Sequence, residues 1–182
     1  MVDAYAFLRG ADESFAAQVR DLGGGDGEGV RFVGSVIGRY SHLVAIESET
    51  LEGISDVVLR LGELAASSGV GVESSITWDD DYCRSLPTGP LPIPPWRGNE
   101  ELVTVAVLVQ VEPTARLRVY AELATHAEVV GASPLYDVAD LLVKVTSADL
   151  AGITAYLDTT LATVAGVRSY KALILKPGQT AD

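Results

Sequence analysis

The sequence predicts an α+β fold in which two copies of a β-α-β-β-α-β unit follow one another in a single chain. One observation is the order of strand-like and helix-like segments in residues 102–176, which is the split pattern of ferredoxin-like domains. The other is an internal repeat, because residues 30–58 match residues 129–157 at a constant offset of 99 positions. A ferredoxin-like sheet carries its helices on one face, so we expect the two modules to pack sheet to sheet through the other face.

The repeat extends over a strand, a helix cap and the start of a helix. Its matched positions include Val30 with Val129, Leu43 with Leu142, Ser48 with Ser147, Gly53 with Gly152 and Ile54 with Ile153. After a short indel, Gly71-Val72-Glu73 aligns with Gly166-Val167-Arg168. The sequence therefore predicts a first module over residues 1–78, a connector over 79–100 and a second module over 101–182.

The first module is expected to hold four strands, at Ala4–Arg9, Val30–Val36, Ser41–Ile46 and Val72–Trp78. Asp12 is the expected N-cap of the first helix, since a short acidic side chain can accept from the free amides of the first turn. Ser48 is the expected N-cap of the second helix. Gly23–Gly29 is interpreted as a linker, because it follows a helix and lacks the Lys and Ser/Thr of a phosphate-binding loop. Gly69 and Gly71 are expected to end the second helix.

The second module is expected to hold four further strands, at Leu102–Val111, Glu128–Leu135, Asp140–Val145 and Arg168–Lys176. Stretches of helical length separate the first strand from the second and the third from the fourth. Between the modules, Asp79-Asp80-Asp81 is followed by five prolines and Trp96, and this density of proline predicts an extended connector. Three consecutive aspartates could bind a hard cation, but such runs are more often solvated.

Composition limits the classes of function. A net charge of −12 argues against nucleic-acid binding by the field of this chain, because phosphates would be repelled. Cys83 is the single cysteine, so an internal disulfide is excluded and a reducing compartment is favoured. The start of the chain does not resemble a signal peptide, and no apolar run reaches the length of a membrane span. We expect a soluble, cytoplasmic protein that contacts no membrane.

The residues of common catalytic centres are missing. His42 and His126 are the two histidines, they lie far from Cys83 in sequence, and no zinc-type cluster accompanies them. His42 falls in a predicted strand where the repeat has Leu141, so a core or wall position is favoured over a catalytic base. No nucleophile elbow and no dinucleotide fingerprint is present. We therefore predict no catalytic residue, no metal site and no cofactor.

Residues 128–145, EVVGASPLYDVADLLVKV, together with VEP after the preceding strand and AGVRSYKALIL at the end, resemble the effector-binding domain of the Lrp/AsnC family of transcription regulators. The family has a Thr-Gly-x-Tyr-Asp-like turn before its third strand. The matching residues in this chain are Gly38, Arg39, Tyr40 and Ser41 after Ile37 in the first copy, and Asp137, Val138, Ala139 and Asp140 after Tyr136 in the second. Ser41 replaces the usual aspartate, and Asp137 replaces the usual glycine.

The resemblance implies an αβ-sandwich that pairs through its sheets, and a small effector, such as an amino acid, bound near this turn. The family places a helix-turn-helix domain before it, but a first strand at about Ala4 leaves no room for one, so a stand-alone tandem effector module is expected. Gly38 and Arg39 could receive a carboxylate, and Asp140 could accept an ammonium group. Alternatively, Gly38 only makes a tight turn and Asp140 only caps a strand.

Three function classes remain open from the sequence. The first is a non-enzymatic regulatory module that binds an amino acid or a similar effector and acts through homo-oligomerisation in transcription-related control. The second is an enzyme of the dimeric αβ-barrel type, either a cofactor-independent monooxygenase or a haem-handling protein, with Arg39, Tyr40 and His42 lining the cavity. The third is a ligand-free assembly module.

Overall fold

The computed structural model describes residues 2–22, 29–77 and 101–176. The first module contains the strands β1 (Val2–Arg9), β2 (Gly29–Ile37), β3 (His42–Ser48) and β4 (Gly71–Ile76), with the helices α1 (Glu13–Arg20) and α2 (Leu51–Ser68). The order is β-α-β-β-α-β, as the sequence predicts. The strand bounds differ from the expected ones by one to two residues, and Trp78 lies outside the described residues, as do Gly23 to Glu28 and the connector 79–100.

The second module repeats this order. Its strands are β5 (Val103–Val111), β6 (Val129–Pro134), β7 (Leu141–Ser147) and β8 (Val167–Leu175). A short 3₁₀ turn, η2 (Pro113–Ala115), leads into α4 (Arg116–Leu123). The second helical stretch is not one regular helix, because α5 (Leu150–Ala155) continues as a π-helix, η3 (Tyr156–Thr160), and a 3₁₀ turn, η4 (Leu161–Thr163).

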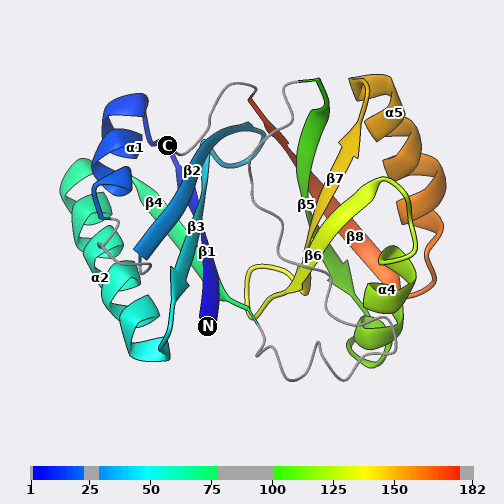
Figure 1. Cartoon of the computed structure of the whole chain (residues 1–182), viewed down its shortest axis with the longest axis horizontal. Helices are drawn as coiled ribbons and strands as arrows, with labels where there is room; N and C mark the ends of the chain where they lie inside the picture. Colours follow the sequence, from blue (N-terminus) through cyan, green and yellow to red (C-terminus); the bar gives the residue numbers. More distant parts are fainter. Residues whose placement is uncertain (1, 23–28, 78–100, 177–182) are drawn as a thin grey trace.

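The eight strands form one antiparallel sheet in the order β4-β1-β3-β2-β8-β5-β7-β6. The modules join where β2 meets β8, through the pairs Val36–Leu175 and Ile37–Ile174. The two outer edges also meet, because Thr77 forms an isolated bridge with Leu135 and the Tyr136 amide donates to the Ile76 carbonyl at 3.1 Å. The sheet therefore closes into an eight-stranded αβ-barrel with the helices outside (Figure 1).

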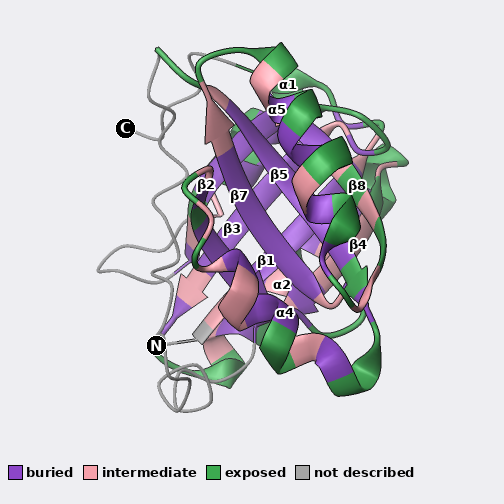
Figure 2. Ribbon diagram, turned by 90° about the vertical axis from the view of Figure 1, so that its right-hand side faces the viewer, coloured by how far each residue is buried: buried purple, intermediate pink, exposed green. Residues whose placement is uncertain are grey.

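Three apolar layers hold this arrangement. Helices α1 and α2 cover the outer face of the first sheet, and α4 and α5 cover that of the second (Figure 1). The third layer fills the barrel between the modules and draws on both, with Tyr5, Phe7 and Leu43 from the first and Leu108 and Leu142 from the second. The inner strands β1, β3, β5 and β7 are largely buried, whereas β4, β8 and the outer helix faces are more exposed (Figure 2). The predicted packing of sheet against sheet is confirmed.

Local sequence explains most of the helix ends. Asp12 caps α1 as expected, with its carboxylate 2.8 Å from the Phe15 amide. The expected cap of α2 was wrong by two residues, because Thr50 rather than Ser48 accepts from the Gly53 amide, at 3.0 Å. Ser48 instead accepts from the Thr50 amide at 3.2 Å, since β3 continues through Ser48. Gly69 ends α2 in the left-handed conformation, as expected.

Across the described residues, we find no helix that has both the length and the apolar character needed to span a membrane.

Candidate functional site

Two equivalent turns lie where the modules face each other. In the first module the Ser41 amide donates to Leu8 at 2.7 Å, and the Val36 amide donates to Ser41 at 2.8 Å. In the second module the Asp140 amide donates to Val109 at 3.0 Å, and the Leu135 amide donates to Asp140 at 2.9 Å. All four bonds run between backbone groups, so both turns are fixed in the same way whatever side chains they carry.

The first residue of each turn has a positive φ angle. Gly38 has φ +148° and Asp137 has φ +84°. Glycine adopts such angles without a steric penalty, and aspartate is among the few other residues that tolerate them. Asp137, which replaces the usual glycine, therefore keeps a positive φ at this position. A side chain at Gly38 would also crowd Leu173 and the Ala172 carbonyl of β8.

A small pocket with a cavity volume of about 40 Å³, partly open to solvent, lies between the two turns. Both modules line it. The first contributes Arg39, Tyr40 and Glu73, and the second contributes Leu108, Gln110, Val138, Ala139, Ser169, Tyr170 and Lys171. This cavity volume is well below the about 300–1,000 Å³ of typical ligand sites. Of the eight predicted site residues, the structure brings Arg39, Tyr40, Val138 and Ala139 to this pocket.

The first module supplies a connected polar group at the pocket wall. Glu73, on β4, accepts a hydrogen bond from the Tyr40 hydroxyl and pairs with Arg9. Its Oε1 also lies 3.5 Å from Nη2 of Arg39. Both guanidinium groups lie over the Tyr40 ring, at 5.5 Å for Arg9 and 5.6 Å for Arg39. Tyr40 is buried and packs on Phe7, with ring centroids 5.2 Å apart, so the cluster is anchored in the barrel core.

Lys171 faces Glu73 from the equivalent position of the other module. Glu73 pairs with Phe7 across β1 and β4, and Lys171 pairs with Leu108 across β5 and β8. Since Phe7 and Leu108 correspond in the two sheets, the register corrects the sequence alignment that paired Glu73 with Arg168. No carboxylate in the described part of the chain forms an ion pair with Lys171. Glu73 is thus paired with Arg9 and Arg39, and Lys171 lines the same pocket without a carboxylate partner among the described residues.

Ser41 and Asp140 do not line the pocket. The Ser41 hydroxyl donates to the Leu8 carbonyl at 3.1 Å and accepts from the Ala11 amide at the same distance. Asp140 forms an ion pair with Arg116 and accepts from the Val111 amide at 2.9 Å. The structure therefore corrects the expectation that Asp140 would receive an ammonium group: its carboxylate holds the turn to α4 and β5, and Glu73 is the carboxylate at the pocket. Gly38 and Asp137 shape their turns without lining it.

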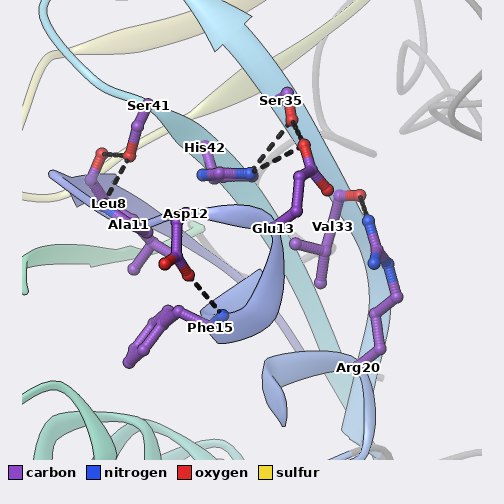
Figure 3. Close-up of polar contacts among 10 residues, drawn as sticks. All are labelled: Leu8, Ala11, Asp12, Glu13, Phe15, Arg20, Val33, Ser35, Ser41 and His42. Atoms are coloured by element: carbon purple, nitrogen blue, oxygen red, sulfur yellow. Dashed lines mark hydrogen bonds and ion pairs between the residues drawn. The ribbon is translucent and has the colours of Figure 1, made fainter. Parts of the chain in front are cut away.

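His42 also lies away from the pocket. It starts β3 on the face that packs under α1, whereas its neighbour Leu43 faces the barrel interior. Its Nε2 is 3.0 Å from the Ser35 hydroxyl and 3.7 Å from Glu13 Oε1, and the Ser35 hydroxyl is 2.7 Å from the same carboxylate oxygen (Figure 3). The prediction of a buried position is right, and the alternative in which His42 lined a catalytic cavity is wrong.

Sequence reasoning missed Glu73, Lys171, Arg9 and Gln110. Glu73 and Lys171 lie on strands that mix polar and apolar residues, and Arg9 and Gln110 lie near the ends of apolar strands, so the pattern does not say which face each residue occupies. Only the register across β1–β4 and β5–β8 places Glu73 and Lys171 on opposite sides of one pocket.

The donor sets of two kinds of centre are not found among the described residues. Within the residues that the structure describes, no group of three or more His, Cys, Asp and Glu side chains could hold a metal ion. Both histidines of the chain lie on helix-facing surfaces, with His42 under α1 and His126 against Tyr156 at 2.9 Å. A haem-type group ligated by histidine inside the barrel therefore does not fit these residues.

Comparisons with known proteins support the fold and leave the family unresolved. Neither a protein-family model nor a curated protein matches this sequence. Among solved structures, the siroheme decarboxylase NirDL matches with a TM-score of 0.60 at 12% identity, over 96% of this chain and 71% of that one. A mutant chlorite dismutase from Candidatus Nitrospira defluvii matches with a TM-score of 0.53 at 11% identity, over 97% and 91%.

A transcriptional regulator from Neisseria meningitidis, solved in complex with L-Met, matches at 18% identity over 69% of this chain and 74% of that one, with a TM-score of 0.36. That score is too low to support an argument. The matches to NirDL and chlorite dismutase do support the coarse part of the resemblance, namely the ferredoxin-like αβ-barrel fold. Membership of the Lrp/AsnC family is not.

Proposed function

We propose that this chain binds a small carboxylic acid with a nearby ammonium group, such as an amino acid, in the pocket between its two modules. The observation that carries this proposal is the excess of cationic side chains at that pocket. Arg39 and Lys171 line it with one carboxylate, Glu73, which already pairs with Arg39 and with the adjacent Arg9, in a chain whose net charge is −12. A ligand carboxylate would compensate this local excess and could form charge-assisted hydrogen bonds with Arg39 and Lys171.

Glu73 can serve the ammonium group of the same ligand. An ionised carboxylate offers about four acceptor sites. In the free protein, Oε1 of Glu73 faces Arg9 and Arg39, and Oε2 accepts from Tyr40. One acceptor site of Oε2 is left for a ligand donor. Val138 and Ala139 form the apolar side of the pocket and would contact the ligand's carbon skeleton.

A second candidate is turnover of the bound ligand without a cofactor. It is favoured by the hydrogen bond between the Tyr40 hydroxyl and the Glu73 carboxylate, because such a pair can take up and return a proton at the pocket wall. Proteins with enzyme names share the barrel over nearly the whole chain, and this adds support at the level of the fold alone. In the first candidate the chain binds without turnover and acts as a regulatory module, a role that stays a prediction.

The test is a thermal-shift screen with amino acids, matched carboxylic acids, amines and amino alcohols, followed by titration calorimetry of the best compound. A ligand that binds the native state raises the melting temperature, so we expect zwitterions to stabilise the protein and amines alone to have no effect. Arg39→Ala should weaken binding by about 1.5–3 kcal/mol, the usual contribution of a hydrogen bond to a charged group. Arg60→Ala, on the exposed surface of α2, is the matched control and should bind like wild type.

Turnover is tested by incubating the best ligand with wild type and with Tyr40→Phe and following the ligand by mass spectrometry. Conversion by wild type and its loss in Tyr40→Phe, with binding retained, would favour the enzyme. Binding without conversion would favour the regulatory module. If no compound shifts the melting temperature, the proposal fails and the assembly module becomes the better interpretation.

A further inference from the structure

The cluster of Glu13, Ser35 and His42 closes the base of the hairpin that carries the pocket residues. Ser35 and His42 occupy facing positions on β2 and β3, and the hairpin between them presents Arg39 and Tyr40. Both cluster residues on the strands are at least 97% buried, whereas the Glu13 side chain is exposed at the start of α1 (Figure 3). A change in the state of His42 would therefore act directly on the support of this hairpin.

The hydrogen bonds assign a protonation state to His42. The Ser35 hydroxyl has one proton, and the Glu13 carboxylate can only accept, so Ser35 donates to Glu13 at 2.7 Å. Ser35 then accepts from Nε2–H of His42 at 3.0 Å. Nε2 therefore carries a proton, and the buried Nδ1 has no hydrogen-bond partner among the described residues, which favours the neutral ring. A proton added at Nδ1 would be a buried donor without an acceptor, which is unfavourable.

The surrounding charges partly offset one another. Burial lowers the pKa of His42 below its ordinary value of 6.5. The Glu13 carboxylate raises this pKa, whereas the positive charges of Arg20 in α1 and Lys176 after β8 lower it further. The hydrogen bond from Ser35 lowers the pKa of Glu13, so its carboxylate persists into acid. Because the pKa of His42 is lower in the folded state, its contribution to stability is complete above about pH 6.5 and is lost as the pH falls toward the folded value.

Ser35 also connects this cluster to the junction between the modules. Its carbonyl accepts from the Lys176 amide at 3.0 Å. That bond extends a β2–β8 junction whose ladder holds only two residue pairs, Val36–Leu175 and Ile37–Ile174. A shift of Ser35 would thus disturb both the hairpin and one of the two joints that close the barrel.

We propose that Glu13, Ser35 and His42 form an acid-sensitive latch, in which protonation of His42 loosens the hairpin base and the β2–β8 junction. The imidazolium requires water or a second acceptor at Nδ1, and the packed cluster provides neither among the described residues. Near neutral pH the latch holds Arg39 and Tyr40 in place, and in mild acid it releases them. This inference goes beyond the proposed binding function and does not depend on the identity of any ligand.

The experiment is amide hydrogen exchange on the full chain without ligand, at about pH 7.5 and about pH 5.5, a window in which histidine is the side chain that changes charge. Rates are corrected for the intrinsic pH dependence of exchange. Two amides report the latch, since Val36 donates within the hairpin and Lys176 donates across the junction. The variants are His42→Leu, which places the residue of the second module at this position, and the matched control His126→Gln.

In wild type and His126→Gln, we expect corrected exchange at Val36 and Lys176 to rise on acidification, by up to about tenfold per pH unit for one proton. His42→Leu should remove this rise. An equal rise in His42→Leu, or none in wild type, would overturn the proposal. Glu13→Gln is a second variant at an exposed position. It removes the charge that favours the imidazolium, so loosening should move to lower pH, and an unchanged or higher midpoint would contradict the latch.

Discussion

The turns Gly38–Ser41 and Asp137–Asp140 occupy equivalent places in the two modules, and they differ at all four positions. Their backbone hydrogen bonds match pair by pair, and both begin with a positive φ angle. The first turn carries Arg39 and Tyr40 where the second carries Val138 and Ala139. The scaffold of the repeat is thus kept, and the chemistry at the pocket is divided unequally between the copies.

The strands beside the turns show the same division. At equivalent positions, β4 carries Glu73 and β8 carries Lys171, while β1 carries Arg9 and β5 carries Gln110. In a symmetric homodimer, equivalent positions of the two subunits carry the same residue. Opposite charges could therefore not be assigned to the two sides. A tandem chain is free of this constraint. The unequal pocket would therefore give a charged ligand one preferred orientation.

The largest expected effects test whether the two modules fold as one unit. Leu43→Ala and Leu142→Ala truncate equivalent, fully buried side chains of the layer between the modules. Each should lower the free energy of unfolding by about 2–5 kcal/mol, the range for buried leucines. Calorimetry should show one transition in wild type and in each variant, moved by similar amounts. Two separate transitions, of which each variant moves only one, would show that the modules unfold independently.

A smaller effect tests whether the repeated glycines serve the same packing role. A Cβ at Gly53 would overlap the Ser48 hydroxyl, and one at Gly152 would overlap the Ser147 hydroxyl. Gly53→Ala and Gly152→Ala should each lower the free energy of unfolding by about 1–3 kcal/mol. Gly62→Ala is the control in α2, where no atom lies within 4 Å of the added carbon. This control should raise the free energy of unfolding by about 0.4–1 kcal/mol. Denaturant titrations of the three variants would measure these differences, and equal effects at all three positions would contradict the packing role.

Much of the fold could be predicted from the sequence because it depends on local and periodic signals. The repeat, the β-branched strands and caps such as Asp12 each rest on residues close together in the chain. The break of the second helix of module two into a π-helix at Tyr156–Thr160 could not be predicted, because the apolar spacing there is compatible with a regular helix. Tertiary contacts of that segment, such as the bond between Tyr156 and His126, have no local signature.

The candidate site was only partly predictable for a related reason. The turn resemblance led to Arg39, Tyr40, Val138 and Ala139, which line the pocket. It gave the wrong carboxylate, since Asp140 is held by Arg116 and the Val111 amide. The pocket carboxylate lies on another strand, and its position follows from the register of the sheet, which the sequence leaves open.

The central claim is that one ligand bridges charged groups from both modules, and calorimetry of Arg39→Ala, Lys171→Met and Asp140→Asn tests it most directly. With the best ligand of the screen, we expect one site per chain and a loss of about 1.5–3 kcal/mol of binding energy in each of the first two variants. Asp140→Asn should bind like wild type but melt at a lower temperature, because its carboxylate supports the turn. A pocket shared by the modules would be contradicted if Lys171→Met kept the wild-type affinity while Arg39→Ala lost affinity. Two sites per chain would contradict it as well.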